Sequence, residues 1–265
     1  MAKSKQNSSS EPKSPKSASE DPPEETTIEF LASLASVLVT GLFIITFVLQ
    51  AFEIPSGSMQ DTLLIGDHVF VNREQFAPPS STLGKLLPYR TPHNDEVAVF
   101  VHPAQPGIFL VKRIIGIPGD RLRVRGGVVY RNGQKLNEPF TKHMPLEQRV
   151  VYADNFPAIP PEGYAVTPEW GATQAQFIQG AEVVVPQDHF FAMGDNRDNS
   201  NDSRYWGFVP QENLIGRPMF IYWSFDTPDG QSEHTTLTER VGFLLHTVLH
   251  FFDMTRWGRT FKVVR

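Results

Sequence analysis

A serine and a lysine, far apart in this chain of 265 residues, could together carry out nucleophilic chemistry. Ser58 follows Pro55 and Gly57 in a segment typical of a tight exposed turn, where its hydroxyl would be open to a substrate. Lys112 stands in the apolar run 109–115, where burial would disfavour the ammonium and lower its pKa. A neutral amine can take the proton of a serine hydroxyl and so act as a general base. Each residue alone also has a plain explanation, as a turn serine and as a lysine that reaches solvent from a strand edge.

A third polar segment, residues 193–210, is dense in asparagine, aspartate, serine and glycine. Such a composition is typical of a loop held together by hydrogen bonds between side chains and backbone. Three of its acidic side chains could bind calcium: Asp195, Asp198 and Asp202. Their spacing does not match a calcium-binding loop, and Arg197 and Arg204 offset their charge. We therefore expect a scaffold role for the segment, with no metal and no other cofactor.

The composition excludes several other kinds of protein. The chain has no cysteine, which rules out disulfides, zinc–thiolate sites and thiol nucleophiles. It has 24 basic and 29 acidic side chains and a formal net charge of −5, which is too acidic for a nucleic-acid scaffold. A serine–histidine–aspartate triad stays open as an alternative, with one of three histidines as its base: His68, His102 or His189.

Three motifs, in this order along the chain, resemble those of the bacterial type I signal peptidases, the membrane-bound Ser–Lys leader peptidases. They are Pro-Ser-Gly-Ser-Met at 55–59, Val-Lys-Arg-Ile-Ile-Gly-Ile-Pro-Gly-Asp at 111–120, and residues 194–200 continuing as 202–207. The third is long and specific. The resemblance covers most of residues 50–225, apart from 141–180.

The resemblance implies a role for each matching residue. Ser58 is expected as the nucleophile and Lys112 as its general base, with the Ser56 hydroxyl and the backbone amide of Ser58 as the oxyanion hole. Ser200 is expected to hydrogen-bond the lysine and orient it. Further residues expected to support the site are Arg113, Asp202 and Arg204. One position departs from the family, which often has proline where this chain has Asp61.

The resemblance also implies an activity, the removal of N-terminal signal peptides from exported preproteins by a membrane-bound serine endopeptidase. Cleavage after a small-x-small sequence, such as Ala-x-Ala, demands shallow apolar pockets. By their motif positions, the expected pocket walls are Ile54, Pro55, Met59, Leu63, Leu110 and Val111. The expected partners are signal-peptide-bearing preproteins and the lipid bilayer, and no nucleic acid.

Short β-branched and aromatic runs predict the strands that must position these residues. They are Asp67–Asn72, 96–101, 109–115 and 182–185. Residues 128–136 carry Asn132-Gly133 between two extended runs, which predicts a tight hairpin. The expected fold class is mainly β over residues 53–265, with antiparallel sheets of the signal-peptidase/LexA-like Ser–Lys type. Within this domain, residues 141–180 are predicted to be an irregular insertion.

The N-terminal part of the sequence predicts a membrane anchor. Residues 1–27 are polar and contain no leucine, valine, isoleucine or aromatic residue, so we expect a disordered tail. From Phe30 to Leu49 no residue is charged. About twenty apolar residues cross a hydrocarbon layer of ~30 Å, which predicts a transmembrane helix over 28–52. Lysines in the tail favour a cytoplasmic N-terminus, and hence a single-pass protein of the plasma membrane with an exported catalytic domain.

An amphipathic helix is predicted over residues 237–256. Its apolar side chains fall on one stripe: Leu237, Val241, Leu244, Leu245, Val248 and Phe252. The basic residues around it are Arg240, Arg256, Arg259, Lys262 and Arg265. The uncharged part is too short to span a membrane. Either the helix packs on the domain, or its basic rim rests on anionic lipid.

Two other functions stay open from the sequence. One is a self-cleaving Ser–Lys protein of the same wider fold, such as the LexA-like repressors. The long apolar N-terminal run and the lack of an N-terminal DNA-binding segment count against it. The other is a catalytically silent, membrane-anchored binding module, which would need neither Ser58 nor Lys112. We therefore expect the signal-peptide-cleaving enzyme.

Overall fold

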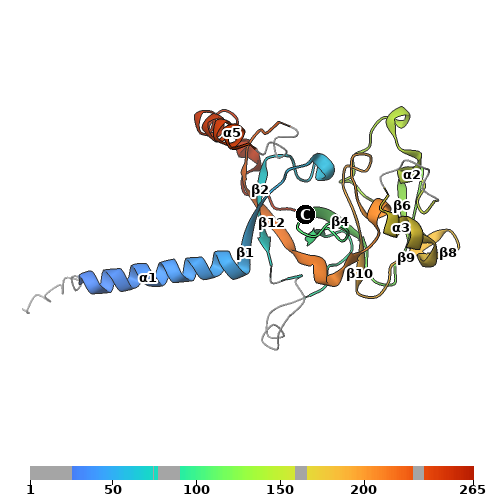
Figure 1. The fold of residues 1–265 in the computed structure, drawn as a ribbon, viewed down its shortest axis with the longest axis horizontal. Coiled ribbons are helices and arrows are strands. Elements are labelled where there is room, and N and C mark those ends of the chain that lie inside the picture. The colour runs from blue at the N-terminus through green and yellow to red at the C-terminus, as the bar shows by residue number, and fades with distance from the viewer. Residues whose placement is uncertain (1–25, 74, 77–89, 159–165, 229–235) are drawn as a thin grey trace, which may run out of the picture. The chain divides into compact units, whose positions relative to one another are not determined.

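The computed structural model describes residues 26–73, 75–76, 90–158, 166–228 and 236–265 (Figure 1). The chain divides between Leu42 and Phe43 into two compact units. The predicted disordered tail, residues 1–27, lies outside the described residues except for its last two.

The N-terminal unit contains the helix α1 (Thr27–Phe43) except for its last residue. α1 begins at a capping box in which the Glu29 amide donates to the Thr26 hydroxyl and the Glu29 carboxylate accepts from the Thr26 amide. A π-helical turn, η1 (Ile44–Val48), follows it along the chain. In the part of the chain that the structure describes, no helix is both long enough and apolar enough to cross a membrane.

The helical segment also ends earlier than the predicted span 28–52. The residues after Val48 form the strand β1 (Leu49–Glu53), which pairs antiparallel with β2 (Asp67–Asn72). Their backbone groups are therefore satisfied by a neighbouring strand and not by a helical turn.

A seven-stranded sheet contains Lys112 and the two strands, β1 and β2, that flank the loop of Ser58. Its strands are paired antiparallel in the order β1, β2, β12, β3, β4, β10, β11. The remaining bounds are β3 (Val97–Val101), β4 (Phe109–Gly116), β10 (His189–Met193), β11 (Val209–Pro210) and β12 (Leu214–Ser224). The strands predicted at 67–72, 96–101 and 109–115 are confirmed to within one residue.

A five-stranded antiparallel sheet follows the order β7, β6, β5, β9, β8. Its strands are β5 (Arg121–Arg125), β6 (Val128–Arg131), β7 (Gln134–Lys135), β8 (Ile178–Gln179) and β9 (Glu182–Val184). The predicted hairpin is confirmed, since Asn132 and Gly133 join β6 to β7 with φ of 53° and 78°, as a type I′ turn requires. The expected mainly-β, antiparallel fold is thus confirmed. In Figure 1 the strands β4 and β10 lie between this sheet and β1, β2 and β12.

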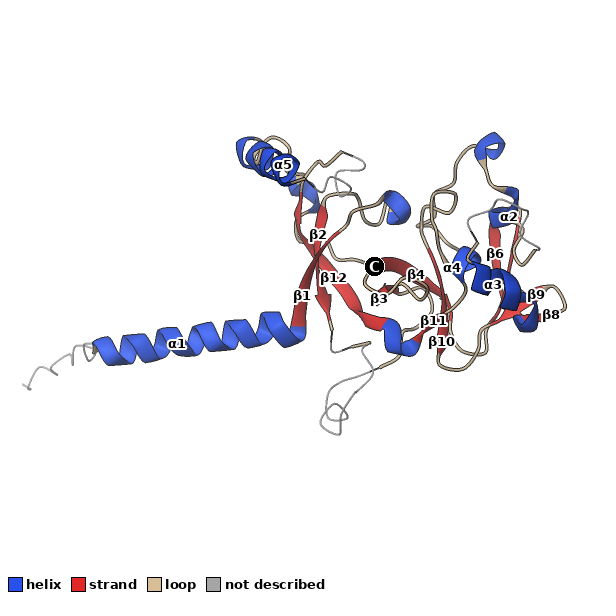
Figure 2. Cartoon of the chain, viewed as in Figure 1, coloured by secondary structure: helices blue, strands red, loops and turns tan. Residues whose placement is uncertain are grey.

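Among the described residues of the second unit, the helices between strands are short, and the longer helix α5 follows the last strand (Figure 2). The helices after β1 and their bounds are η2 (Gly57–Met59), η4 (Leu146–Gln148), α2 (Val151–Asp154), α3 (Pro168–Thr173), η5 (Gln174–Phe177), α4 (Ser203–Trp206), η6 (Gln211–Asn213), α5 (Leu237–Leu249) and η8 (Trp257–Arg259).

The segment 141–180 differs from the predicted irregular insertion. It contains α2, α3 and β8, and three of its aromatic side chains, Tyr152, Phe156 and Trp170, are almost fully buried. They pack in one core cluster with Leu122 and Val183 of the smaller sheet. The segment therefore completes the core of that sheet, and its helices are too short to produce a long periodic pattern.

The C-terminal helix also differs from its prediction over 237–256. α5 ends at Leu249, and the chain then returns to the sheet through a bridge between Phe225 and Thr255. The helix meets the domain through Phe243 and His246, whose rings each lie 6.2 Å from the ring of Phe225. The predicted apolar stripe is on another face and is exposed to solvent. The helix therefore packs on the domain, but not through the stripe.

Candidate active site

Ser58 lies in η2, on the loop between β1 and β2. Ile54 holds the start of the loop, because its amide donates to β2 and its carbonyl accepts from the Gly66 amide. Two apolar side chains of the loop, Met59 and Leu63, are fully buried in a core cluster. The loop is thus anchored on both sides of a serine that stays partly exposed.

Lys112 reaches this serine from β4. It is 3% exposed, and its Nζ donates a hydrogen bond to the Oγ of Ser58 at 2.5 Å. Burial lowers the pKa of the Lys112 ammonium from 10.5 to about 8. Asp202 and Asp195 oppose the effect of burial, whereas Arg204 adds to it. With this pKa, about one tenth of the amine is uncharged at pH 7 and about half at pH 8.

A cavity of about 330 Å³ adjoins the pair. All of the predicted wall residues except Leu63 line it, together with Ser56, Ser58 and Lys112. Leu63 is instead fully buried in the core behind the loop, so its predicted place in the pocket is wrong. Four lining residues were not predicted: Phe52, Glu53, Ile108 and Phe109. Strand alternation could have indicated Phe52, which shares a face with Ile54.

Asn196 is a further residue that the sequence did not single out. Its backbone amide donates to the Ser58 carbonyl at 3.0 Å, and its side-chain amide donates to the Gly57 carbonyl at 3.1 Å. Both bonds fix peptide groups next to the Ser58 hydroxyl. Asn196 belongs to the polar loop, so this loop contacts the serine directly.

Gly194, at the start of the polar loop, lies closer to the serine than a side chain would allow. A Cβ at this position would stand 2.3 Å from the Oγ of Ser200 and 2.5 Å from the carbonyl oxygen of Ser58. Ser200 is nearly buried, and its Oγ has no hydrogen-bond partner among the described residues. The expected hydrogen bond from Ser200 to Lys112 is thus not formed in this structure.

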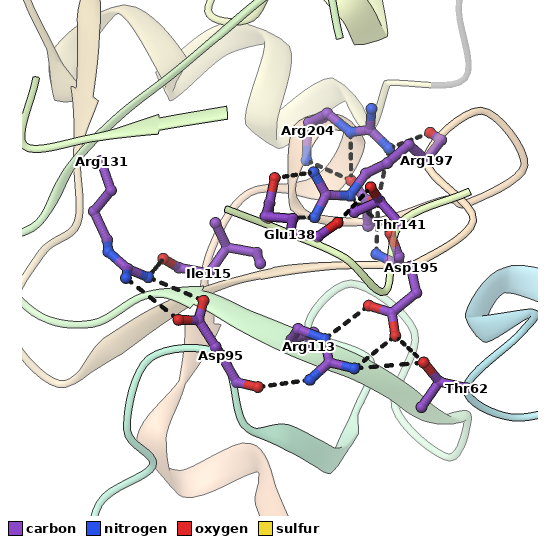
Figure 3. A network of polar contacts seen from close by, with 12 residues as sticks. Thr62, Asp95, Arg113, Ile115, Arg131, Glu138, Thr141, Asp195, Arg197 and Arg204 are labelled. Atoms are coloured by element: carbon purple, nitrogen blue, oxygen red, sulfur yellow. Dashed lines mark hydrogen bonds and ion pairs between the residues drawn. The ribbon is translucent and has the colours of Figure 1, made fainter. Parts of the chain in front are cut away.

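Arg113 links β4 to the loop of Ser58 through Asp195 (Figure 3). It donates to both carboxylate oxygens of Asp195, at 2.8 and 2.7 Å, and to the backbone oxygen of Asp95 at 2.6 Å. Thr62, from the serine loop, donates to the same carboxylate at 2.5 Å. The buried guanidinium also lies over the ring of Phe140. Such a charge is tolerated in the interior because each of its three nitrogens has a hydrogen-bond acceptor.

Asp202 and Arg204 form a second buried ion pair. Asp202 accepts from the Gly194 amide at 3.1 Å, and Arg204 donates to its two oxygens at 2.9 and 2.8 Å. Burial alone would raise the pKa of the Asp202 carboxyl, but the neighbouring Arg204 holds it below its usual value. Arg204 also donates to the carbonyl of Arg197, whose guanidinium pairs with Glu138 at 2.9 and 2.5 Å. The calcium alternative therefore loses two of its ligands, since Asp195 and Asp202 are bound to arginines.

The geometry does not support a histidine as base. His68 stacks on Trp223 with ring centroids 4.8 Å apart, and His102 lies against Trp206. His189 contacts a backbone carbonyl. Within the described ranges, no hydrogen bond joins any of the three to the serine.

The turn after Ser58 has a backbone conformation that proline at position 61 could not adopt. Asp61 has φ of 80°, which proline cannot adopt. Its side chain is exposed, with an oxygen 4.0 Å from the Nζ of Lys142. The departure from the family at this position therefore changes the backbone and the charge at the rim, and leaves the serine and the lysine in contact.

Comparisons with known proteins identify the family of this chain. The family model for "Signal peptidase, peptidase S26" matches residues 27–223. Signal peptidase I of Pseudomonas aeruginosa is 30% identical over 237 residues, which cover 82% of this chain and 79% of its own. Probable signal peptidase I-2 of Synechocystis is 35% identical over 204 residues, 77% of each chain. The solved structure of a signal peptidase I from Enterococcus faecalis covers 48% of this chain and 97% of its own, with 25% identity and a TM-score of 0.31. The chain therefore belongs to the type I signal peptidases of the S26 family, serine peptidases that cleave signal peptides.

Proposed function

We propose that this enzyme cleaves signal peptides by acyl transfer to Ser58, with the neutral amine of Lys112 as the general base. One observation carries the proposal: the buried Nζ lies 2.5 Å from Oγ, and its pKa is lowered to about 8. A base must lie within hydrogen-bonding distance of the proton that it takes, and its pKa should be near the working pH. The pair meets both conditions.

The reaction has two halves. In the first, Oγ attacks the carbonyl carbon of the scissile peptide bond while Nζ takes the hydroxyl proton. The tetrahedral intermediate then breaks its C–N bond, and Nζ gives this proton to the leaving amine. In the second half, Nζ takes a proton from water, the oxygen of that water attacks the acyl ester, and the proton returns to Oγ as the acid product leaves.

The oxyanion of each intermediate would be bound by the Ser58 amide and the Ser56 hydroxyl. Ser56 lines the cavity beside the nucleophile, in an extended conformation. Asn196 supports this arrangement, because its two hydrogen bonds hold the peptide groups of Gly57 and Ser58 before any substrate binds. Preorganised donors of this kind contribute about 2.7–4 kcal/mol each to transition-state stabilisation.

The substrate would bind as an added strand. β10 pairs with β4 only from Arg113 onward, so no described strand pairs with that edge of residues 109–112. An extended peptide can use such an edge. Its side chains alternate, so the first and third residues before the cleaved bond would point together into the cavity. Phe52 and Phe109, with ring centroids 5.4 Å apart, narrow the apolar walls and favour small side chains at both positions.

We propose further that the uncharged run from Phe30 to Leu49 anchors the enzyme in the plasma membrane, with its N-terminus in the cytoplasm. The support is the sequence itself, its length without charge and the lysines that precede it. The substrates are membrane-tethered preproteins, which such an anchor would bring to the same surface.

Two substitutions test the chemistry. Ser58→Ala and Lys112→Ala are each expected to abolish cleavage of a preprotein that carries an Ala-x-Ala site, because each removes one half of the pair. Lys135→Ala, at an exposed lysine of β7, is the matched control and should cleave normally. Circular dichroism establishes that the variants are folded. Substantial turnover by the folded Lys112 variant would remove lysine from the role of base.

A further inference from the structure

We propose that His143, Asp154 and Asp198 form a binding site for one divalent transition-metal ion such as Zn²⁺. None of the three lines the cavity next to Ser58. They come from three parts of the chain: the stretch before η4, the last residue of α2 and the polar loop. Each offers one ligand atom, and these atoms lie within 4.8 Å of one another.

Asp198 gives the first indication of a missing partner. Its side chain is 0% exposed. One carboxylate oxygen, Oδ2, accepts from the Met144 amide at 2.7 Å and lies 3.2 Å from the Nδ1 of His143. The other oxygen, Oδ1, is buried and has no hydrogen-bond partner among the described residues. An ionised oxygen in this state is costly, and a bound cation would satisfy it.

Gly127 gives the second indication, because it leaves space where the side chains meet. It lies between β5 and β6 with φ of 79°. A Cβ there would stand 3.0 Å from an oxygen of Asp154, 3.3 Å from the His143 ring and 3.2 Å from Arg149. These groups thus converge over a position where no side chain of Gly127 separates them.

The charge of the cluster favours a cation. Arg149 is next to it, with Nε 3.9 Å from Oδ2 of Asp198, but this Nε donates to the Met144 carbonyl at 2.8 Å. The two carboxylates, of Asp154 and Asp198, outnumber this single guanidinium. With a neutral His143 the group therefore keeps a net negative charge.

The donor set selects the kind of metal. One imidazole and two carboxylates suit Zn²⁺, whereas Ca²⁺ requires six to eight oxygens. Tetrahedral coordination at ~2.1 Å holds neighbouring ligand atoms about 3.4 Å apart. Nδ1 of His143 already lies 3.2 Å from Oδ2 of Asp198, and a pair of ligand atoms at the 4.8 Å limit would have to move about 1.4 Å closer together. A water molecule would take the fourth position.

The position of the site indicates a structural role. Next to His143, the backbone of Lys142 hydrogen-bonds to Asp195 and Arg197. Both belong to the polar loop, which contacts Ser58 through Asn196. An ion at this point would link the segment 141–180, which packs on the smaller sheet, to the polar loop. It would act on stability, and the proposed Ser–Lys chemistry would proceed without it.

Calorimetric titration of the metal-free full-length protein with ZnCl₂ tests the site. All of these measurements are made in a background that also carries His246→Gln and His250→Gln, because these two rings lie 4.6 Å apart at the end of α5 and could bind zinc independently. We expect one equivalent to bind. Asp154→Asn or His143→Gln should weaken binding at least tenfold. Arg149→Gln should strengthen it about tenfold, since it removes a neighbouring cation. CaCl₂ should not bind.

The Arg149 variant distinguishes a metal site from a simple ion-pair network. In such a network, removal of the Arg149 guanidinium would not improve zinc binding. Asp154→Asn should cleave substrate at the normal rate in metal-free buffer, which shows that it is folded. Zinc-edge X-ray absorption should detect one imidazole among nitrogen and oxygen ligands. The proposal is overturned if no zinc binds in the background variant, if Asp154→Asn binds zinc as before, or if Arg149→Gln binds it less tightly.

Discussion

At the scale of the residue, the proposed chemistry depends on how strongly the surroundings of Lys112 lower its pKa. Two carboxylates near Lys112 would raise its pKa and keep it charged, yet each is already paired, Asp195 with Arg113 and Asp202 with Arg204. Burial therefore dominates, and the pKa falls to about 8. The arginines that hold the polar loop together thus also limit the stabilisation of the ammonium.

The pH dependence of cleavage follows from this pKa. Because only the neutral amine can accept the Ser58 proton, kcat/KM should rise about tenfold per pH unit below pH 8 and level off above it. The measurement is cleavage of an Ala-x-Ala peptide between pH 6 and pH 10, in conditions where chemistry limits the rate. A flat profile would contradict the prediction, and so would a midpoint near 10.5, the value of an ordinary lysine.

The lowered pKa of Lys112 also means that burial of its charged form costs folding free energy. Below pH 8 Lys112 is protonated in both states and the full cost of its burial is present. Between about pH 8 and pH 10.5 the unfolded chain binds the proton that the folded chain has lost, so stability rises with pH. Lys112→Met should therefore raise the free energy of unfolding at pH 7, by up to about 3 kcal/mol.

Urea denaturation at several pH values measures this gain for Lys112→Met. The difference from the unsubstituted protein should shrink as the pH approaches 10.5. A variant that is less stable at every pH would show that the charged amine is held favourably, against the proposed role of burial.

At the scale of the element, the strands could be predicted but their pairing could not. β2 alternates buried and half-buried residues along its length, a pattern that each strand shows on its own. Its neighbour β12 comes from much later in the chain, and Ser224 bonds to Asp67 across 157 positions. No local pattern encodes that contact.

The same limit explains which site residues were missed. Ser58, Lys112 and Asn196 all stand in the matched motifs, but no local pattern indicates that Asn196 would hydrogen-bond the backbone carbonyls of Gly57 and Ser58. In α5, periodicity indicated which residues share a face. It could not indicate that the helix would pack through Phe243 and leave Leu244 exposed, because that choice depends on the shape of the sheet beneath.

The close approach of the polar loop to the serine loop gives a prediction at this scale. Gly194→Ala would place a Cβ 2.5 Å from the backbone oxygen of Ser58, a contact that only a shift of one loop can relieve. A displacement of about 1 Å at the nucleophile can lower the rate ~100-fold, so we expect a loss of kcat of that order. Steady-state kinetics and a thermal melt measure it. Gly171→Ala in α3, where no atom is closer than 4.0 Å, is the control and should retain activity. Normal kcat in the Gly194 variant would show that the two loops need not touch.

At the scale of the whole molecule, the chain separates into a unit that holds the proposed chemistry and one that does not. Ser58, Lys112, the cavity and the polar loop all lie in the unit after Leu42. Its two sheets and their cores are built from its own residues. The first unit therefore has no part in the proposed reaction, and its proposed role is to hold the enzyme at the membrane.

This separation predicts that a variant without residues 1–42 loses membrane retention and keeps catalysis. It should fold, cleave a soluble Ala-x-Ala peptide at nearly the full-length rate and pass largely to the soluble fraction, because the uncharged run has been shortened to less than half. The exposed stripe of α5 could retain part of it, so the same truncation with Leu244→Ser and Val248→Ser is the matched variant. Fractionation and peptide kinetics on the same preparations separate the two properties. If the truncated enzyme is folded but inactive towards the soluble peptide, the first unit takes part in catalysis. If it sediments with membranes as fully as the intact chain even after the α5 substitutions, the uncharged run is not the anchor.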